Sequence, residues 1–133
     1  MATTQRFEFA FDSAYVRLLG LVGVRPENAW VEVDDIALSA RFGPWSVRTP
    51  RTNIMAAHIT GPYLWWRVIG VRVSLADRGL TLGSNTHQGV CVELRVPVRG
   101  VDPWGLVRHP GLTATVAEPE NLSRLLNTRP AGT

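Results

Sequence analysis

The chain has 133 residues, of which 45% are hydrophobic and 19% are charged, so it is globular rather than disordered and has the size of one domain. Its only cysteine, Cys91, excludes an internal disulfide and favours a reducing compartment. The first residues lack the basic start and apolar run of a secretion signal, and no apolar stretch approaches the ~18 residues of a membrane span. We therefore expect a single cytoplasmic domain over residues 1–133, with no transmembrane segment.

The charge is spread unevenly along the chain. Every basic residue is arginine; residues 1–40 carry a net charge of −3, residues 41–108 carry +6, and the remainder balances to leave +3 overall. A basic middle predicts an acidic or anionic partner. Solvated outward faces of strands would give the same count, because clustering in space is not visible in a sequence.

The N-terminal part predicts a strand followed by a helix. Residues 5–11 alternate between phenylalanine and other side chains, which is typical of a half-buried strand. Asp12 is a good helix N-cap, and Gly23 with Pro26 ends the helix. The apolar residues at helical spacing are Tyr15, Leu18, Leu19 and Val22. The extension covers residues 1–28, and we expect its strand and helix, residues 6–23, to be an integral part of the fold that lies along a free edge of the barrel, with Leu18, Leu19 and Val22 covering it.

Seven strand-like runs follow the extension, separated by turn signals. Asp34-Asp35, Gly43-Pro44 and Asp77-Arg78-Gly79 are turns, and Pro50 interrupts the third strand. The strands are expected over residues 30–33, 36–42, 45–49 (resuming as 54–60), 71–75, 80–83, 90–96 and 112–116. Residues 63–70 are expected to be a connection, and residues 118–126 a short amphipathic helix.

This order predicts a mainly β fold with helices (α+β). Seven antiparallel strands avoid exposed edges by curling into a bent, incomplete barrel over residues 29–126, and the last helix then plugs an open end. The plug would consist of Leu122, Leu125 and Leu126, and residues 127–133 would be a frayed tail. The inward-facing positions are bulky and apolar, and include Ile36, Leu38, Phe42, Val73, Leu75, Val92 and Leu94.

From residue 30 to residue 126 the chain resembles a bacterial pleckstrin-homology-like (PH-like) domain. The resemblance covers about three quarters of the chain, and it depends on the order of features that are unspecific alone. These are the hairpin over residues 30–38, Arg41-Phe42-Gly43, Asn53-Ile54, the turn at residues 77–79 and the segment over residues 116–122. It implies a seven-strand bent barrel capped by a C-terminal helix, with a binding or scaffolding role.

One departure limits what the resemblance implies. Lipid-binding members of the wider superfamily hold inositol phosphates with basic residues in the loop between the first two strands. The corresponding loop here is Asp34-Asp35, and two carboxylates would repel a phosphorylated headgroup. The resemblance therefore carries over the fold and not phosphoinositide binding.

The sequence predicts no catalytic residue, no metal site and no cofactor. His58, His87 and His109 have no metal-ligand spacing, and no phosphate-binding or nucleophile motif is present. Cys91 lies within an expected strand and is interpreted as structural. An acid–base pair of His87 with Asp77 or Glu93 is an alternative to a simply solvated histidine.

Aromatic and basic residues give the candidate contact site. One connection contains, in succession, Tyr63, Leu64, Trp65, Trp66 and Arg67. These rings either line a groove, touch a membrane surface or anchor a partner protein, or one tryptophan closes the end of the barrel and the other packs under the N-terminal helix. If the third and fourth strands are neighbours, these residues share a basic face with outward arginines. The predicted contact residues are Arg48, Arg51, Trp65, Trp66, Arg67 and Arg72. A nucleic-acid partner is disfavoured, because there is no recognition helix and the net charge is modest.

Two functions from different classes remain open. The first is a non-catalytic binding or interaction module that engages a protein or an anionic surface, with self-association as one outcome. The second is a small-ligand carrier or enzyme with a pocket inside the barrel, which needs small or polar inward residues. The bulky inward positions favour the first.

Overall fold

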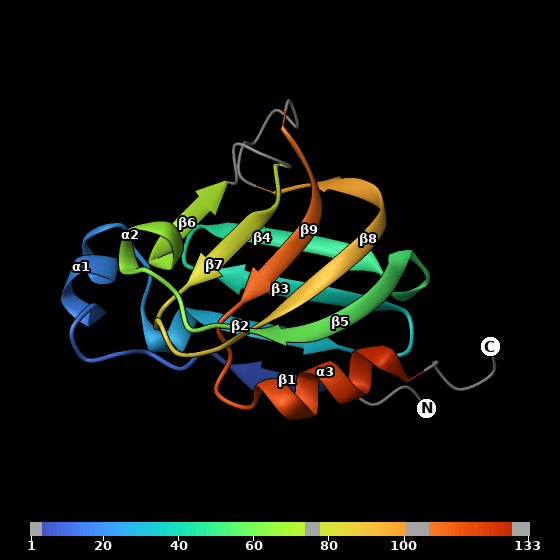
Figure 1. The fold of residues 1–133 in the computed structure, drawn as a ribbon, viewed down its shortest axis with the longest axis horizontal. Helices are drawn as coiled ribbons and strands as arrows, with labels where there is room; N and C mark the ends of the chain where they lie inside the picture. Colours follow the sequence, from blue (N-terminus) through green and yellow to red (C-terminus); the bar gives the residue numbers. More distant parts are fainter. Residues whose placement is uncertain (1–3, 74–77, 101–106, 129–133) are drawn as a thin grey trace.

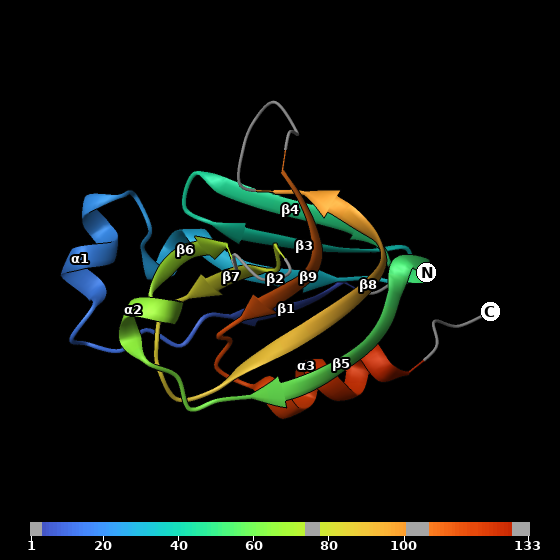
Figure 2. The ribbon, with the colours of Figure 1, turned by 45° about the horizontal axis from the view of Figure 1, so that its top comes forward.

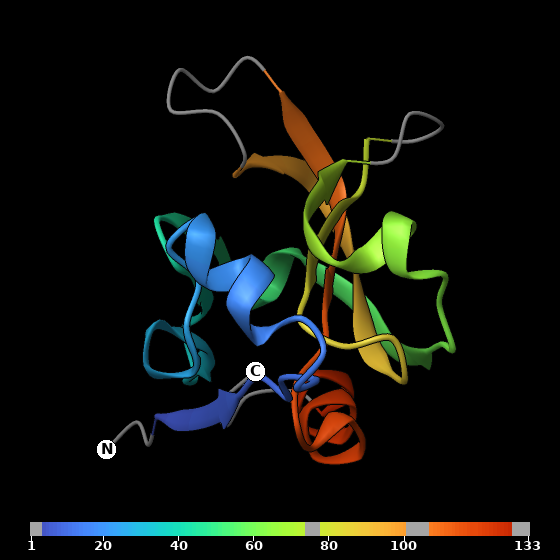
Figure 3. The ribbon, with the colours of Figure 1, turned by 90° about the vertical axis from the view of Figure 1, so that its left-hand side faces the viewer.

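The computed structural model describes residues 4–73, 78–100 and 107–128, and they form a mainly β fold with two sheets and a C-terminal helix (Figure 1). Seen along the long axis, the two sheets stand opposite each other and the C-terminal helix lies at one side of the gap between them (Figure 3). The predicted class, mainly β with helices, is confirmed.

The first sheet contains four antiparallel strands in chain order. They are β1 (Gln5–Glu8), β2 (Ala29–Val33), β3 (Ala37–Phe42) and β4 (Trp45–Pro50). The strand pattern of the sequence explains the burial, since Val31, Val33, Ala40 and Phe42 are all buried. Asp34 forms the turn between β2 and β3, where its Oδ1 accepts hydrogen bonds from the backbone N–H groups of Ile36 and Ala37, both at 2.8 Å.

The second sheet contains five strands in the order β5-β8-β9-β7-β6. They are β5 (Ile54–Thr60), β6 (Gly70–Val73), β7 (Leu80–Gly83), β8 (Gly89–Arg99) and β9 (Arg108–Ala114). Strands β7 and β9 pair in parallel, and the other pairs are antiparallel. The expectation of seven antiparallel strands after the N-terminal strand therefore needs correction. The segment that was expected to resume the third strand is a separate strand, β5, in the other sheet, and β7 pairs with β9 in parallel.

Five helical segments connect or flank the strands. They are α1 (Val16–Leu21), the 3-10 turns η1 (Pro26–Asn28) and η2 (Arg51–Asn53), α2 (Trp65–Val68) and α3 (Pro119–Asn127). The short helix α2 replaces the expected irregular connection. No helix within the described ranges is both long enough and apolar enough to cross a membrane.

The sheets meet at one edge through the end of β1. A β-bridge joins Phe9 to Val116, and the backbone N–H of Ala117 donates to the carbonyl of Glu8 at 2.8 Å. The ladder does not continue around the molecule, so the described residues form no closed barrel. Helix α3 covers the side between the sheets and buries Leu122 and Leu126, whereas Leu125, the third residue of the predicted plug, is only partly buried.

The core between the sheets is apolar and includes the N-terminal strand. Phe7 and Phe9 are buried, and the ring of Phe9 lies 4.9 Å from that of Phe42. The strand predicted over residues 5–11 is shorter than expected, since only residues 5–8 pair with β2, but it supplies core side chains as predicted.

Three expected inward residues are exposed instead. Ile36 is 71% exposed because it belongs to the Asp34 turn and not to β3. Leu18 and Val22 are about half exposed, since α1 has only six residues and reaches the core through Leu19. The expected inward position Leu75, together with Asp77 and Trp104, lies outside the described residues.

Candidate functional site

Arg51, one of the predicted contact residues, is buried. Its side chain is 8% exposed, and Nη2 donates to the carbonyls of Leu125 at 2.8 Å and Thr128 at 2.7 Å, at the C-terminal end of α3. Nη1 also donates to the carbonyl of Asp34 at 3.3 Å. A guanidinium at a helix C-terminus satisfies carbonyls that have no partner within the helix. Arg51 therefore joins α3 to the first sheet and is not available to a partner.

The other predicted residues fall into two places. Arg48 is exposed on β4 of the first sheet and donates to the hydroxyl of Ser39 at 2.9 Å. Arg67 and Arg72 belong to α2 and β6, beside the second sheet, and Nε of Arg72 donates to the carbonyl of Ile69 at 2.9 Å. The structure thus groups Trp65, Trp66, Arg67 and Arg72, and leaves Arg48 on the other sheet.

Trp65 and Trp66 stand on the surface. They are 50% and 52% exposed, and their rings meet edge to face with centroids 5.9 Å apart. Leu64, immediately before them, is 49% exposed. The alternative interpretation, in which these tryptophans close the end of a barrel, does not apply to side chains that are half in solvent.

The C-terminal end of helix α2, which follows the exposed tryptophans, packs tightly against the second sheet. Val68 and Ile69 are 1% and 3% exposed, and the carbonyl of Val68 sits so close to Gly83 of β7 that a side chain would not fit there. Before α2, the hydroxyl of Tyr63 bonds to that of Thr60, and burial raises the pKa of Tyr63. The backbone therefore holds the two tryptophan rings outward in a defined place.

Helix α1 lies at the same end of the long axis as α2 (Figures 1 and 2). It exposes Leu18, Leu21 and Val22, at 50%, 84% and 52%. These residues share one face, because positions three and four apart are neighbours on a helix. We call the six side chains of α1 and α2 the apolar end: Leu18, Leu21, Val22, Leu64, Trp65 and Trp66. They are six of the ten large apolar side chains that are exposed among the described residues, so exposure is concentrated there.

Four arginines belong to the segments that form the apolar end. Residues 12–27 contain Arg17 and Arg25, with the acids Asp12 and Glu27 at the two ends, and residues 59–73 contain Arg67 and Arg72 and no acid. All four arginines are exposed. The sequence indicated the α2 part of this surface but missed α1, whose apolar residues were expected to face inward.

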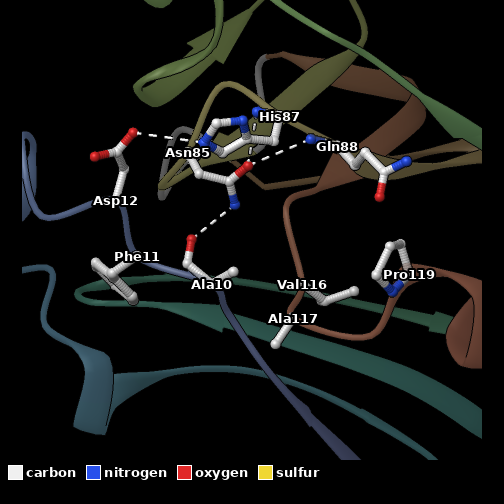
Figure 4. Close-up of a pocket in the computed structure, with 9 residues that line it drawn as sticks. All are labelled: Ala10, Phe11, Asp12, Asn85, His87, Gln88, Val116, Ala117 and Pro119. Carbon is white, nitrogen blue, oxygen red and sulfur yellow. Dashed lines mark hydrogen bonds and ion pairs between the residues drawn. The ribbon is translucent and has the colours of Figure 1, made fainter.

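A separate pocket of about 330 Å³ opens where the β7–β8 loop meets the N-terminal segment (Figure 4). Its lining comes from residues 10–12, from the loop at Asn85, His87 and Gln88, and from Val116, Ala117 and Pro119. It lies at the border of the two sheets and not between them. The space between the sheets is filled by apolar side chains.

The polar groups beneath this pocket are hydrogen-bonded to other groups of the protein. Asn85 donates to the carbonyl of Ala10 at 2.7 Å and accepts from the backbone N–H of His87 at 2.9 Å. The hydroxyl of Ser84 donates to the same carbonyl at 2.7 Å, and it lies 3.0 Å from the hydroxyl of Thr115. These buried groups fasten the loop to the N-terminal segment, which is a structural role.

His87 has a different partner from the two considered in the sequence. Its Nε2 lies 3.8 Å from Oδ2 of Asp12, whereas Asp77 lies outside the described residues. The side chain of His87 is 79% exposed, so the pair is a surface contact at the rim of the pocket. Cys91 is half-buried on β8 opposite His58 of β5. The described residues contain no group of three or more potential metal ligands.

Comparison with known proteins finds no matching family model, no similar curated protein and no similar solved structure. The resemblance to PH-like domains therefore stays a prediction, and the functional argument depends on the geometry of this chain alone.

Proposed function

We propose that the protein is a non-catalytic binding module whose contact surface is the apolar end. The observation that carries the proposal is the exposure of six large apolar side chains on two short helices at one end of the molecule. Large apolar side chains that are exposed together at one end of a molecule mark interaction sites, whereas single exposed apolar residues are ordinary. The firm attachment of α2 supports it, because a preorganised contact surface loses less entropy on binding.

The alternative, a carrier or enzyme with a pocket inside a barrel, has less support. Leu38, Phe42, Leu82 and Val90 fill the space between the sheets and are each no more than 1% exposed. The pocket beside His87 lies outside that space, and its ionisable groups pair with each other.

The finer description of the fold, a PH-like bent barrel, is also a proposal. The hairpin of β2 and β3 and the capping position of α3 support it. The parallel pair of β7 and β9 and the unclosed ladder depart from the expected barrel of antiparallel strands. A solved structure of a relative with a known function would test this relationship.

Site-specific photo-crosslinking tests the contact surface without assuming what the partner is. A benzophenone amino acid replaces Trp66 in one variant and Ile36 in another, and both are irradiated in the cells that produce the chain. Ile36 is a matched control, because it is 71% exposed but lies in the turn between β2 and β3. We expect adducts with protein, with lipid or with a second copy from position 66 only. Equal adducts from both positions would refute the proposed surface.

A further inference from the structure

We infer that the apolar end binds the surface of an anionic lipid bilayer, with the rings of Trp65 and Trp66 at the level of the headgroups. The inference rests on the proposed contact surface and names its partner. Three features support it: the kind of side chain that is exposed, the arginines in the same segments, and the different chemistry of the turn at Ile36.

The exposed side chains are those that suit a membrane interface. Tryptophan is enriched at that depth, because its ring is apolar while its indole N–H needs a polar partner. Trp65 and Trp66 present two such rings at right angles, each about half exposed. Leu64 beside them and Leu21 on α1, which is 84% exposed, are purely apolar and belong deeper in the acyl boundary. The end therefore offers both the anchors and the apolar area of an interfacial segment.

The charge selects an anionic surface. Arg17 lies on α1 and Arg25 follows it, with Asp12 and Glu27 at the ends of this segment, and Arg67 and Arg72 lie beside the tryptophans in a segment without an acid. Basic residues close to an anionic leaflet strengthen binding, and the attraction falls off within a Debye length. Arginine side chains also extend along apolar surface while their guanidinium groups stay in water. A bilayer satisfies four dispersed arginines at once, because its phosphates are not fixed in place.

The turn between β2 and β3 does not combine exposed apolar side chains with positive charge. Ile36 is also exposed there, but Asp34 and Asp35 directly precede it. Oδ1 of Asp34 accepts two backbone hydrogen bonds, which lower the pKa of its carboxyl group and keep it ionised at neutral pH. Carboxylates at the tip of this turn would repel anionic lipid. This turn therefore joins its exposed apolar side chain to negative charge, whereas the segments of the apolar end carry exposed arginines.

Co-sedimentation of the purified full chain with lipid vesicles tests the inference. One set of vesicles is phosphatidylcholine alone, and the other contains about 30% phosphatidylglycerol as the anionic lipid. We expect binding to the anionic vesicles only, weakened several-fold when salt rises from about 0.05 M to about 0.5 M. A blue shift of tryptophan emission should accompany binding, because the exposed rings leave water.

Three variants locate the contact. Trp65→Ala/Trp66→Ala should lower the partition coefficient by roughly 10- to 100-fold, from the loss of two half-exposed anchors. Leu21→Ser should lower it several-fold, and this side chain contributes little to the fold because it is 84% exposed. Ile36→Ser is the matched control and should bind like the parent. Thermal melting of each variant checks that it is folded.

The outcomes separate this inference from the proposed function. Failure of the parent to bind anionic vesicles, equal binding to neutral vesicles, or an equal loss in Ile36→Ser would each overturn the lipid inference. If position 66 nevertheless forms protein adducts in cells, the contact surface stands and its partner is a protein. If position 66 forms no specific adduct and vesicles are not bound, both proposals fail.

Discussion

Replacing Arg51 by methionine should destabilise the protein strongly, although arginine is ordinarily a surface residue. The guanidinium group is buried, and it donates three hydrogen bonds to backbone carbonyls from two parts of the chain. Two of the carbonyls, those of Leu125 and Thr128, lie at the C-terminal end of α3, where the carbonyl of Leu125 also accepts from the backbone N–H of Thr128 at 3.2 Å. Methionine fills much of the same volume but cannot donate, so the substitution isolates the hydrogen bonds.

The two short hydrogen bonds, to Leu125 and Thr128, determine the expected loss in the free energy of unfolding. A hydrogen bond from a charged donor contributes about 1.5 kcal/mol or more, so the loss of two amounts to about 3 kcal/mol in the free energy of unfolding. The third bond, at 3.3 Å, adds little. For a chain of this size, 3 kcal/mol corresponds to a fall in Tm of about 10 °C. With a urea slope of about 2 kcal/mol per M, the unfolding midpoint falls by about 1.5 M.

Urea unfolding at neutral pH measures the effect, and Arg48→Met provides the matched control. Arg48 is exposed on the neighbouring strand and makes one hydrogen bond to a side chain, so its replacement should change stability by no more than about 0.5 kcal/mol. Added salt should leave the difference between the two variants unchanged, because a buried group is poorly screened. Equal midpoints for the two variants would show that Arg51 does not hold α3 to the sheet.

Two further predictions concern the turn of the first sheet and the support of α2. Hydrogen bonds from the backbone N–H groups of Ala37 and Ile36 lower the pKa of Asp34 in the folded protein, so the stabilisation from its charge is present above about pH 4 and is lost as pH falls through the lowered value. Asp34→Asn should therefore reduce the urea midpoint at pH 7 and have a much smaller effect near pH 2, whereas a constant difference would contradict this linkage. Gly83→Ala should prevent folding, as measured by circular dichroism, because the added methyl group overlaps the α2 backbone. The control, Gly20→Ala, should fold normally, because the space around Gly20 is open. A folded Gly83→Ala variant would show that α2 is loosely held.

The parts of the fold that were predictable from the sequence are local. Alternation of side chains predicted the strands of the first sheet, and the Asp34-Asp35 pair predicted the turn between β2 and β3. The amphipathic pattern before residue 127 predicted α3 and its buried Leu122. Each of these signals depends on neighbours within a few residues, which is the range over which backbone preference and periodicity act.

The role of Arg51 and the composition of the apolar end depend on long-range contacts. Arg51 meets Leu125, which lies 74 residues further along the chain, and no local pattern marks such an arginine as buried. Periodicity placed Leu18 and Val22 on one face of α1, but it does not tell whether that face meets the core or the solvent. The parallel pairing of β7 with β9 is equally non-local, since residues 84–107 separate the two strands.

Because long-range contacts are not visible in the sequence, the distribution of charge along the chain predicted the basic surface in the wrong place. The excess of +6 over residues 41–108 pointed to Arg48, Arg51 and Arg72, yet these lie on different sheets and one is buried. Reversing all three charges would test folding rather than binding, because it would remove the contact of Arg51 with α3. Two of the four arginines around the apolar end come instead from residues 1–40, where the net charge is −3.

A charge-matched pair of variants separates the placement of charge from its total. Arg17→Gln/Arg67→Gln removes two positive charges at the apolar end, and Arg48→Gln/Arg95→Gln removes two exposed charges elsewhere. Each arginine near an anionic leaflet is worth about 1 kcal/mol, so the first pair should weaken vesicle binding by roughly 10- to 30-fold at low salt and the second should weaken it far less. The difference should shrink as salt is added. Equal weakening would mean that the vesicles respond to net charge, and that the arginines of α1 and α2 have no special role.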